Sequence, residues 1–431
     1  MSAAAPVRYR SEDEDSARWQ DFAFREGDIV ISTRSKCGTT WMQMICALLV
    51  FQTGELPAPL GRLSPWLDWT GAPRDEILAR LSAQDHRRFI KTHTPLDGIP
   101  VDGRATYIVV ARDPLDMAVS LYHQGDNIDR ARLRQLTGQP DPADRPPPRP
   151  SLHSWLLGWI DWEGSPLGQM DSLPGVVWHA TDAWARRHHP NIVLVHYDDL
   201  SSDLEGTMRA LAARLGIAVP EATWPVIVRA ARFEEMRARA DTVAPDPADI
   251  LKDRRAFFRR GTSGAGREVL SPPELAHYRR RVGLMAPPEV SAWLHHEGDQ
   301  RETSLSVRRL RGRVAGGRGD LAHWMTEYAD LYRRVTDVAL FPGSLNVVLD
   351  HEYRLPPHPL RLEPAEYGGR VGMNLVPCRI GAIAGFVVRT DQNEAGTGHH
   401  GRHVVEVAAA VNLREALGLV DGDEVEIVIG D

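Results

Sequence analysis

The chain has 431 residues, 42% hydrophobic and 25% charged, which is the composition of a soluble globular protein with two or three domains. Its formal net charge of −7 argues against a nucleic acid or an anionic membrane surface as a partner. Three cysteines are too few for a disulfide framework or a zinc site, the polar N-terminus does not resemble a signal peptide, and no apolar run approaches the ~18 residues of a membrane helix, so we expect a cytoplasmic protein.

Strand-like and helix-like runs alternate in the first two thirds of the chain. The three pairs are 27–33 with 37–51, 105–114 with 115–124, and 191–200 with 205–217. Such alternation is typical of an α/β fold, in which a parallel sheet is flanked by helices.

The pattern changes near residue 302, after a polar stretch that we interpret as a linker. Two helical runs follow, at 327–335 and 412–419. The remaining runs are short and strand-like, at 311–317, 344–350, 370–380, 384–390, 403–410 and 423–430. They predict a small, mostly-β barrel. We therefore divide the chain into a domain at 1–298, a linker at 299–309 and a domain at 310–431.

A candidate anion site follows the first strand, in the segment "SKCGTTW". A tight turn at Gly38 and a helix that opens at Thr39 and Thr40 would point free N–H groups at a phosphate or sulfate. Lys36 adds a compact charge, and it is one of only three lysines beside forty-eight arginines. Because Lys36 precedes the glycine, the full P-loop pattern is absent, which disfavours an ordinary kinase or ATPase. A simple capped helix remains an alternative.

The segment "RFIKTHTP" places a second lysine, Lys91, two residues before His93. On an extended chain both side chains point to one face. A lysine beside a histidine suits removal of a proton from an acceptor and neutralisation of a developing charge. A histidine with a purely structural role is the alternative.

Two further segments carry candidate phosphate ligands. Arg112 ends a strand-like run, and Ser120 lies two turns into the next helical run, so one phosphate could be held by both. Arg259, Arg260 and Gly261 stand on a glycine-rich loop that could close over a phosphate. A surface arginine, a helix serine and a flexible basic loop are the alternatives.

In this order, "SKCGTTW", "KTH", "ARDPLDMAVS" and "RRG" resemble the motifs of the cytosolic-type sulfotransferases, over about residues 27–294. The segments "SPWLDW" and "VHYDDL" match further landmarks of that family. The resemblance implies transfer of a sulfuryl group from 3′-phosphoadenosine 5′-phosphosulfate (PAPS) to a hydroxyl of a small-molecule acceptor. The acceptor itself stays open, and so does the oligomeric state, because the family's dimerisation motif is not evident.

The same resemblance implies roles for individual residues. His93 would be the general base, Lys36 would contact the bridging oxygen of the phosphosulfate, and Lys91 would stabilise the transferring group. The co-substrate would lie on Ser35, Lys36, Cys37, Gly38, Thr39, Thr40 and Trp41, on Arg112, Ser120, Arg259, Arg260 and Gly261 around the 3′-phosphate, and on Tyr197 and Phe233 around the adenine. Ser35 and Cys37 depart from the proline and serine that are usual in the family.

The C-terminal run from "LFPGSLNVVLD" to "NLREALGLVDGD" resembles the archaeal CTP-dependent riboflavin kinases, a cradle-loop barrel family, over about residues 310–429. That resemblance implies that CTP, Mg²⁺ and riboflavin yield FMN, which would make the chain bifunctional. Ser344 and Asn346 would be the Mg²⁺ ligands, Gly317 and Gly319 would belong to the nucleotide loop, and Glu406 would face the flavin.

Two departures keep a second interpretation of the barrel open. Leu321 replaces the third glycine of the nucleotide loop, and the module contains no lysine. A degenerate nucleotide- or flavin-binding module, or an interaction module without catalysis, is the alternative. The histidine-rich run 396–403 is better explained as a solvated loop than as a metal site.

Overall fold

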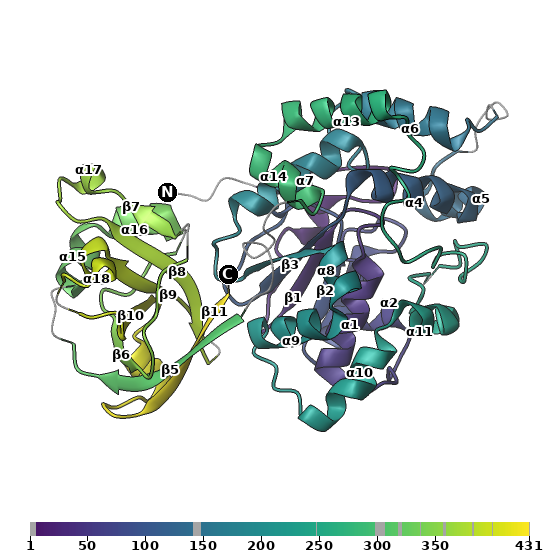
Figure 1. Cartoon of the computed structure of the whole chain (residues 1–431). Helices are drawn as coiled ribbons and strands as arrows, with labels where there is room; N and C mark the ends of the chain where they lie inside the picture. The colour runs from purple at the N-terminus through teal and green to yellow at the C-terminus, as the bar shows by residue number, and fades with distance from the viewer. Residues whose placement is uncertain are drawn as a thin grey trace. The chain divides into compact units, whose positions relative to one another are not determined.

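The structure is a computed structural model, and it describes residues 6–140, 148–246, 248–297, 307–317, 321–336, 338–356, 359–381, 383–398 and 400–430. The chain forms two compact units that divide near residue 304 (Figure 1). Residues 298–306 lie outside the described residues, so the linker start at 299 stays a prediction, whereas residues 307–309 already belong to a strand of the second unit.

The first unit is built on a four-stranded sheet flanked by helices (Figure 1). Its strands are β1 (Ile29–Thr33), β2 (Phe89–Thr92), β3 (Thr106–Ala111) and β4 (Ile192–His196), in the order β2-β1-β3-β4. β1 pairs in parallel with both β2 and β3. The first three strands are buried along their whole length, as expected of parallel strands covered on both faces. The predicted α/β class is therefore confirmed.

The helices of this unit are numbered in chain order. They are α1 (Thr39–Phe51), α2 (Leu60–Leu63), α3 (Arg74–Ser82), α4 (Pro114–Asn127), α5 (Arg130–Thr137), α6 (Leu152–Asp161), α7 (Leu173–Ala185), α8 (Tyr197–Ser202), α9 (Leu204–Arg214), α10 (Trp224–Ala230), α11 (Phe233–Ala238), α12 (Ala240–Val243), α13 (Pro272–Met285) and α14 (Pro288–Leu294), with short 3₁₀ turns at Ser16–Trp19, Leu96–Gly98 and Glu221–Thr223. No helix of the described residues is long and apolar enough to cross a bilayer.

The third predicted strand, over 191–200, was wrong in its second half. β4 ends at His196, and α8 begins at Tyr197. The imidazole of His196 accepts the backbone N–H of Asp198, and the carboxylate of Asp199 accepts the backbone N–H of His196. This reciprocal cap satisfies the first amides of a helix and so converts an apolar strand directly into a helical turn.

Helix α1 fixes the position of everything attached to its first turn. It is buried from Thr39 to Leu49, and it packs against β1 and β2. A helix that is buried nearly all round has no freedom to tilt, because its neighbours fill the space at crystal-like density. The N-terminus of α1 is therefore a rigid place on which to hold a ligand.

The second unit is a closed antiparallel barrel (Figure 1). Six strands follow one another in the order β11-β5-β6-β10-β9-β8, and β11 also pairs with β8, which closes the ring. A short seventh strand, β7, pairs with β8. The strands are β5 (Val307–Ala315), β6 (Leu345–Leu349), β7 (Leu360–Leu362), β8 (Met373–Ile380), β9 (Ile383–Thr390), β10 (Val404–Ala409) and β11 (Glu424–Gly430). The predicted barrel is confirmed, and its six closing strands fall on the six strand-like runs.

Helices of the barrel unit were predicted less completely. The two expected helical runs correspond to α16 and α19, but three other helices are present. The helices are α15 (Leu321–Glu327), α16 (Ala329–Thr336), α17 (Pro364–Tyr367), α18 (Asp391–Ala395) and α19 (Leu413–Leu417). Two of the missed helices have only four or five residues, which is too short for a helical hydrophobic period to be visible.

Candidate active site

The candidate anion loop connects β1 to α1, as predicted. Lys36 and Gly38 both adopt left-handed backbone conformations, with φ of 62° and 101°. A side chain at Gly38 would also bring a Cβ within 3.0 Å of the Tyr197 ring. Glycine is therefore required there by backbone and by space, and the strained Lys36 is held by its surroundings.

The ammonium group of Lys36 lies among aromatic and positively charged groups. Its Nζ is 3.9 Å from the centroid of the Phe257 ring and 3.3 Å from the Oε1 of Gln124. Burial, and then the charge of Arg112, lowers the pKa of Lys36 to about 7. Among the described residues Lys36 makes no ion pair, so its charge is available to an anionic ligand.

Lys91 and His93 share one aromatic neighbour, Trp66. The Nζ of Lys91 lies 3.6 Å from the centroid of the Trp66 ring, and the His93 ring packs edge-on against the same indole with centroids 4.9 Å apart. The Nδ1 of His93 lies 2.5 Å from the carbonyl oxygen of Thr33. Because a carbonyl only accepts, Nδ1 must donate, which leaves the lone pair on Nε2.

The protonation states suit a base. Burial, together with the charge of Lys91, holds the pKa of His93 well below its usual value, so the ring is neutral near pH 7. Burial lowers the pKa of Lys91 to about 8, against the opposing effect of Glu14 and other carboxylates. A neutral His93 with its lone pair on Nε2 can accept a proton from a hydroxyl.

Arg112 links the anion loop to a second loop far along the chain. Its two terminal nitrogens donate to the carbonyl oxygens of Lys36 (3.0 Å) and Thr262 (3.1 Å), and its guanidinium lies 4.1 Å from the centroid of the Tyr197 ring. The Tyr197 ring packs edge-on against Trp41, with centroids 5.3 Å apart. The predicted nucleotide residues of three segments are thus brought together.

The basic loop is shaped by Gly261 and Phe233. Gly261 has φ of 69°, and a Cβ there would lie 2.6 Å from the Phe233 ring. The loop therefore passes directly against the aromatic ring, which only glycine permits. Arg259 is half-buried, and its Nε is buried without a hydrogen-bond partner among the described residues. Arg260 is exposed and pairs with Glu268 at 3.2 Å.

Asp116, on the first turn of α4, anchors the far side of this loop. Its two carboxylate oxygens accept the backbone N–H groups of Gly264 (2.7 Å) and Gly266 (2.8 Å). Hydrogen bonds to a charged acceptor are among the stronger ones in proteins, at about 1.5–3 kcal/mol. The position of the loop therefore depends on Asp116.

Three predicted residues make fewer contacts with the other residues of the candidate active site. The Cys37 side chain packs in an apolar cluster, and burial raises the pKa of its thiol to about 12, so it stays neutral. Ser35 is half-buried in the loop. Ser120 is half-buried on α4, and its hydroxyl makes no hydrogen bond within the described part of the chain.

Four contributors were not named from the sequence: Thr33, Trp66, Asp116 and Phe257. Each lies in or beside a segment that was already singled out, and Trp66 stands in "SPWLDW". Their contacts join positions from 25 to 221 residues apart, which no local pattern reveals.

In the barrel unit, the structure brings the predicted residues of two strands together. Asn346 on β6 pairs in register with Glu406 on β10, and the Oγ of Ser344 lies 3.4 Å from the Oε1 of Glu406. A Cβ at Gly317 would lie 3.0 Å from the Nδ2 of Asn346. Gly319 lies outside the described residues.

The donor set of this group fits Mg²⁺. The Oδ1 of Asn346 is buried and has no hydrogen-bond partner among the described residues, so it could take a ligand. Together with the Ser344 hydroxyl and the Glu406 carboxylate it offers hard oxygen donors, which Mg²⁺ prefers. Burial raises the pKa of Glu406, which a bound cation would offset.

Leu321 does not lie in an open loop. It is the first residue of α15, and its side chain packs in an apolar cluster with Met325 and Tyr332. The leucine at this position is thus explained by helix packing.

Comparison with known proteins covers both units. A family model described as a sulfotransferase domain matches residues 26–281, and a CTP-dependent riboflavin kinase model, described as a domain of unknown function, matches residues 314–429. A glycolipid sulfotransferase of Mycobacterium bovis is 40% identical over 307 residues, 67% of this chain and 94% of the relative. Sulfotransferase 1A1 of Canis lupus familiaris is 28% identical over 60% of this chain and 82% of its own length.

Among solved structures, a mouse sulfotransferase, SULT7A1, complexed with PAP aligns with a TM-score of 0.49 and 20% identity. That alignment covers 64% of this chain and 90% of the mouse protein.

The anchoring role of Asp116 can be measured directly. In Asp116→Ala, the amides of Gly264 and Gly266 should exchange with solvent about tenfold faster or more, because two charge-assisted hydrogen bonds are lost. Hydrogen–deuterium exchange at the basic loop reports the change. As the matched control, Asp203→Ala removes a carboxylate that accepts from Gly206 and should leave that loop unchanged. Equal exchange rates in both variants would contradict the anchoring role.

Proposed function

Because the chain belongs to the sulfotransferase family, we propose that its first domain, residues 1–298, transfers a sulfuryl group from PAPS to a hydroxyl of a small-molecule acceptor. The observation that carries the proposal is the neutral, Nδ1-protonated His93 beside Lys91 and one strand away from the Lys36 loop. The three cysteines are buried and free, which agrees with a reducing cytoplasm.

The donor would bind along the cationic face that joins the two loops. The first turn of α1, with Lys36, Thr39 and Thr40, would hold the 5′-phosphosulfate through amides, hydroxyls and one ammonium group. Arg112, Ser120, Arg259, Arg260 and Gly261 would hold the 3′-phosphate. Support comes from two buried guanidinium nitrogens, the Nε atoms of Arg112 and Arg259, which lack hydrogen-bond partners within the described residues. Trp41, Tyr197 and Phe233 would enclose the adenine.

The transfer step follows from the placement of the three functional side chains. The Nε2 of His93 accepts the proton of the acceptor hydroxyl while that oxygen forms a bond to sulfur. The bond between sulfur and the bridging phosphate oxygen breaks, and 3′-phosphoadenosine 5′-phosphate (PAP) leaves. Lys36 neutralises the charge on the leaving oxygen, and Lys91 neutralises the charge on the sulfuryl oxygens.

A glycolipid is the acceptor class that we favour, because the 40%-identical relative is named a glycolipid sulfotransferase. A pair of stacked indoles lies beside His93. Trp66 and Trp69 stack with ring centroids 6.2 Å apart, and Trp66 contacts His93.

The role of His93 predicts a separation of binding from turnover. His93→Ala should reduce sulfuryl transfer at least about 100-fold, as expected for loss of a general base, while PAP binding changes little. Single-turnover assays and calorimetry measure the two quantities. The control is His86→Ala, three residues before β2, which should keep full activity. Retained turnover in His93→Ala would refute the role.

The depressed pKa of Lys36 predicts proton uptake on binding. At pH 8 an ammonium group with a pKa near 7 is mostly neutral, and a bound phosphate raises its pKa, so PAP binding should take up a proton. The uptake should vanish at pH 6, where Lys36 is already charged, and PAP affinity should fall as the pH rises above 7. Calorimetry in buffers of different ionisation enthalpy measures the protons.

Two lysine variants test the assignment of that proton. Lys36→Arg should lose most of the uptake, because guanidinium stays charged, whereas Lys252→Arg, at a lysine that bonds the carbonyl oxygen of Asp126, should keep it. The same uptake in all three proteins would show that another group binds the proton.

For the second domain, residues 310–431, we propose a CTP:riboflavin 5′-phosphotransferase that makes FMN, supported by the unpartnered buried Asn346 beside Ser344 and Glu406. Ser344 and Asn346 would hold Mg²⁺, which neutralises charge on the nucleotide phosphates when it is bound. The absence of lysine from this domain and the helix at Leu321 favour the alternative, a nucleotide- or flavin-binding or interaction module without catalysis.

An assay with CTP, Mg²⁺ and riboflavin separates the two possibilities. We expect FMN from the full chain, and loss of FMN in Asn346→Ala because a metal ligand is removed. Asn412→Ser is the control, since serine retains the capping of α19. If CTP, ATP and GTP all yield no FMN, the domain is not catalytic.

A further inference from the structure

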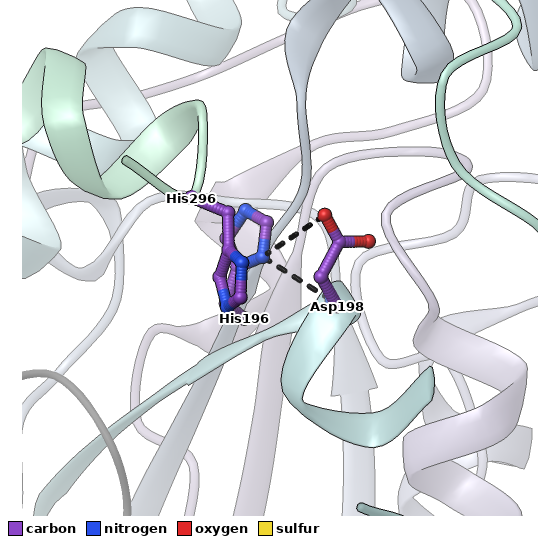
Figure 2. A group of neighbouring side chains, drawn as sticks. All are labelled: His196, Asp198 and His296. Atoms are coloured by element: carbon purple, nitrogen blue, oxygen red, sulfur yellow. Dashed lines mark hydrogen bonds and ion pairs between the residues drawn. The ribbon is translucent and has the colours of Figure 1, made fainter. Parts of the chain in front are cut away.

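Three potential metal ligands meet at the end of β4, outside the sulfuryl-transfer group. His196 ends β4, Asp198 lies in the first turn of α8, and His296 follows α14 (Figure 2). One ligand atom from each lies within 4.8 Å of the others, and this is the only such group of three among the described residues. His196 is fully buried, while Asp198 and His296 are partly exposed, so an ion could enter from solvent.

Each imidazole is held from behind by an acceptor. The Nε2 of His196 lies 3.3 Å from the carbonyl oxygen of Leu294, and the Nε2 of His296 lies 2.9 Å from the Oδ1 of Asp199. These bonds leave Nδ1 of each ring as the ligand atom. Metal-binding histidines almost always donate their second N–H to a carbonyl or carboxylate in this way, which fixes the tautomer and ring orientation.

The Asp198 carboxylate is arranged in the same manner. Its Oδ1 accepts the hydroxyl of Ser263, and its Oδ2 lies 3.9 Å from the Nδ1 of His196. Two ligand atoms bound at about 2.0–2.1 Å to a tetrahedral ion lie roughly 3.4 Å apart, so this pair would have to approach by about half an ångström.

One existing contact would have to give way to the ion. The Nδ1 of His196 accepts the backbone N–H of Asp198 at 3.2 Å, which is long for such a bond. The two rings stack with centroids 4.7 Å apart and an interplanar angle of 23°, so one ring must tilt for both lone pairs to meet.

We propose that His196, Asp198 and His296 form a site for a divalent transition metal of the zinc type, with water completing the coordination. Two nitrogen donors and one carboxylate suit such an ion and do not suit Mg²⁺ or Ca²⁺, which prefer oxygen throughout. The ion would join the start of α8 to the chain after α14. Through Ser263 it would also reach the basic loop that carries Arg259 and Arg260.

The test is Zn²⁺ binding to the metal-free full-length protein. Calorimetry should show one Zn²⁺ per chain, and Co²⁺ should give the visible absorption of a tetrahedral site. His296→Ala and Asp198→Asn should each weaken Zn²⁺ binding at least about tenfold, because a side chain that binds the metal directly is lost. His277→Ala is the matched control, since His277 pairs with Asp161 at 2.6 Å without a second histidine, and it should bind like the wild type.

A second measurement guards against a variant that fails to fold. Zn²⁺ should raise the thermal unfolding midpoint of the wild type and of His277→Ala but not that of His296→Ala, because an ion stabilises only the state that binds it. The proposal is overturned if the wild type binds no Zn²⁺, if His296→Ala and Asp198→Asn bind as well as the wild type, or if His277→Ala loses as much affinity as they do. None of these outcomes bears on sulfuryl transfer, which His93 tests separately.

Discussion

The first unit depends on holding several positive charges close together without neutralising them. Lys36 lies over Phe257, Lys91 over Trp66 and Arg112 over Tyr197, each at 3.6–4.1 Å from the ring centroid. An aromatic face stabilises a cation by about 0.5–2 kcal/mol without supplying a negative charge. The cations therefore stay available to an anionic donor, and the depressed pKa of Lys36 reflects first its burial and then the nearby charge of Arg112.

The same arrangement joins distant segments into one site. Arg112 bonds the carbonyl oxygens of Lys36 and Thr262, and Asp116 bonds two amides of the loop that follows. The loop on which Arg259 and Arg260 stand is thus positioned from α4 and the end of β3, in addition to the packing of Gly261 against Phe233. If Arg112 binds the donor as proposed, donor binding and loop position are coupled, since both depend on the same guanidinium group.

The candidate site of the barrel differs from the cationic site of the first unit. None of its described candidate residues is a cation, and its most distinctive group is the buried amide oxygen of Asn346, which lacks a partner among the described residues. Buried polar atoms without partners are costly and uncommon in native structures. An ion held between Asn346, Ser344 and Glu406 would remove that cost, and it would supply a positive charge in a domain whose basic side chains are arginines and not lysines.

Much of this protein could be predicted from sequence. Helices α1, α4 and α9, the strands β1, β3 and β4 and the six closing strands of the barrel follow from hydrophobic period and turn residues, which are local properties. Helices as long as α7 and α13 were not predicted. Lys36, Gly38, Lys91 and His93 stood out because a compact charge or a left-handed turn admits few residue types. The end of β4 at His196 was missed because its cap is made by side chains that no apolar pattern records.

Tertiary structure decided which groups act on one another. The proton on the Nδ1 of His93 is placed by the Thr33 carbonyl, which lies on the neighbouring strand, and Trp66 contacts both Lys91 and His93 from a separate segment. The meeting of His196, Asp198 and His296 likewise joins the end of β4 to a residue 100 positions later. The sequence alone therefore determined which chemical groups are present and how each segment folds. Their protonation states and partners were decided only by the packing, because pKa values and hydrogen bonds depend on neighbours that come together through the folded chain.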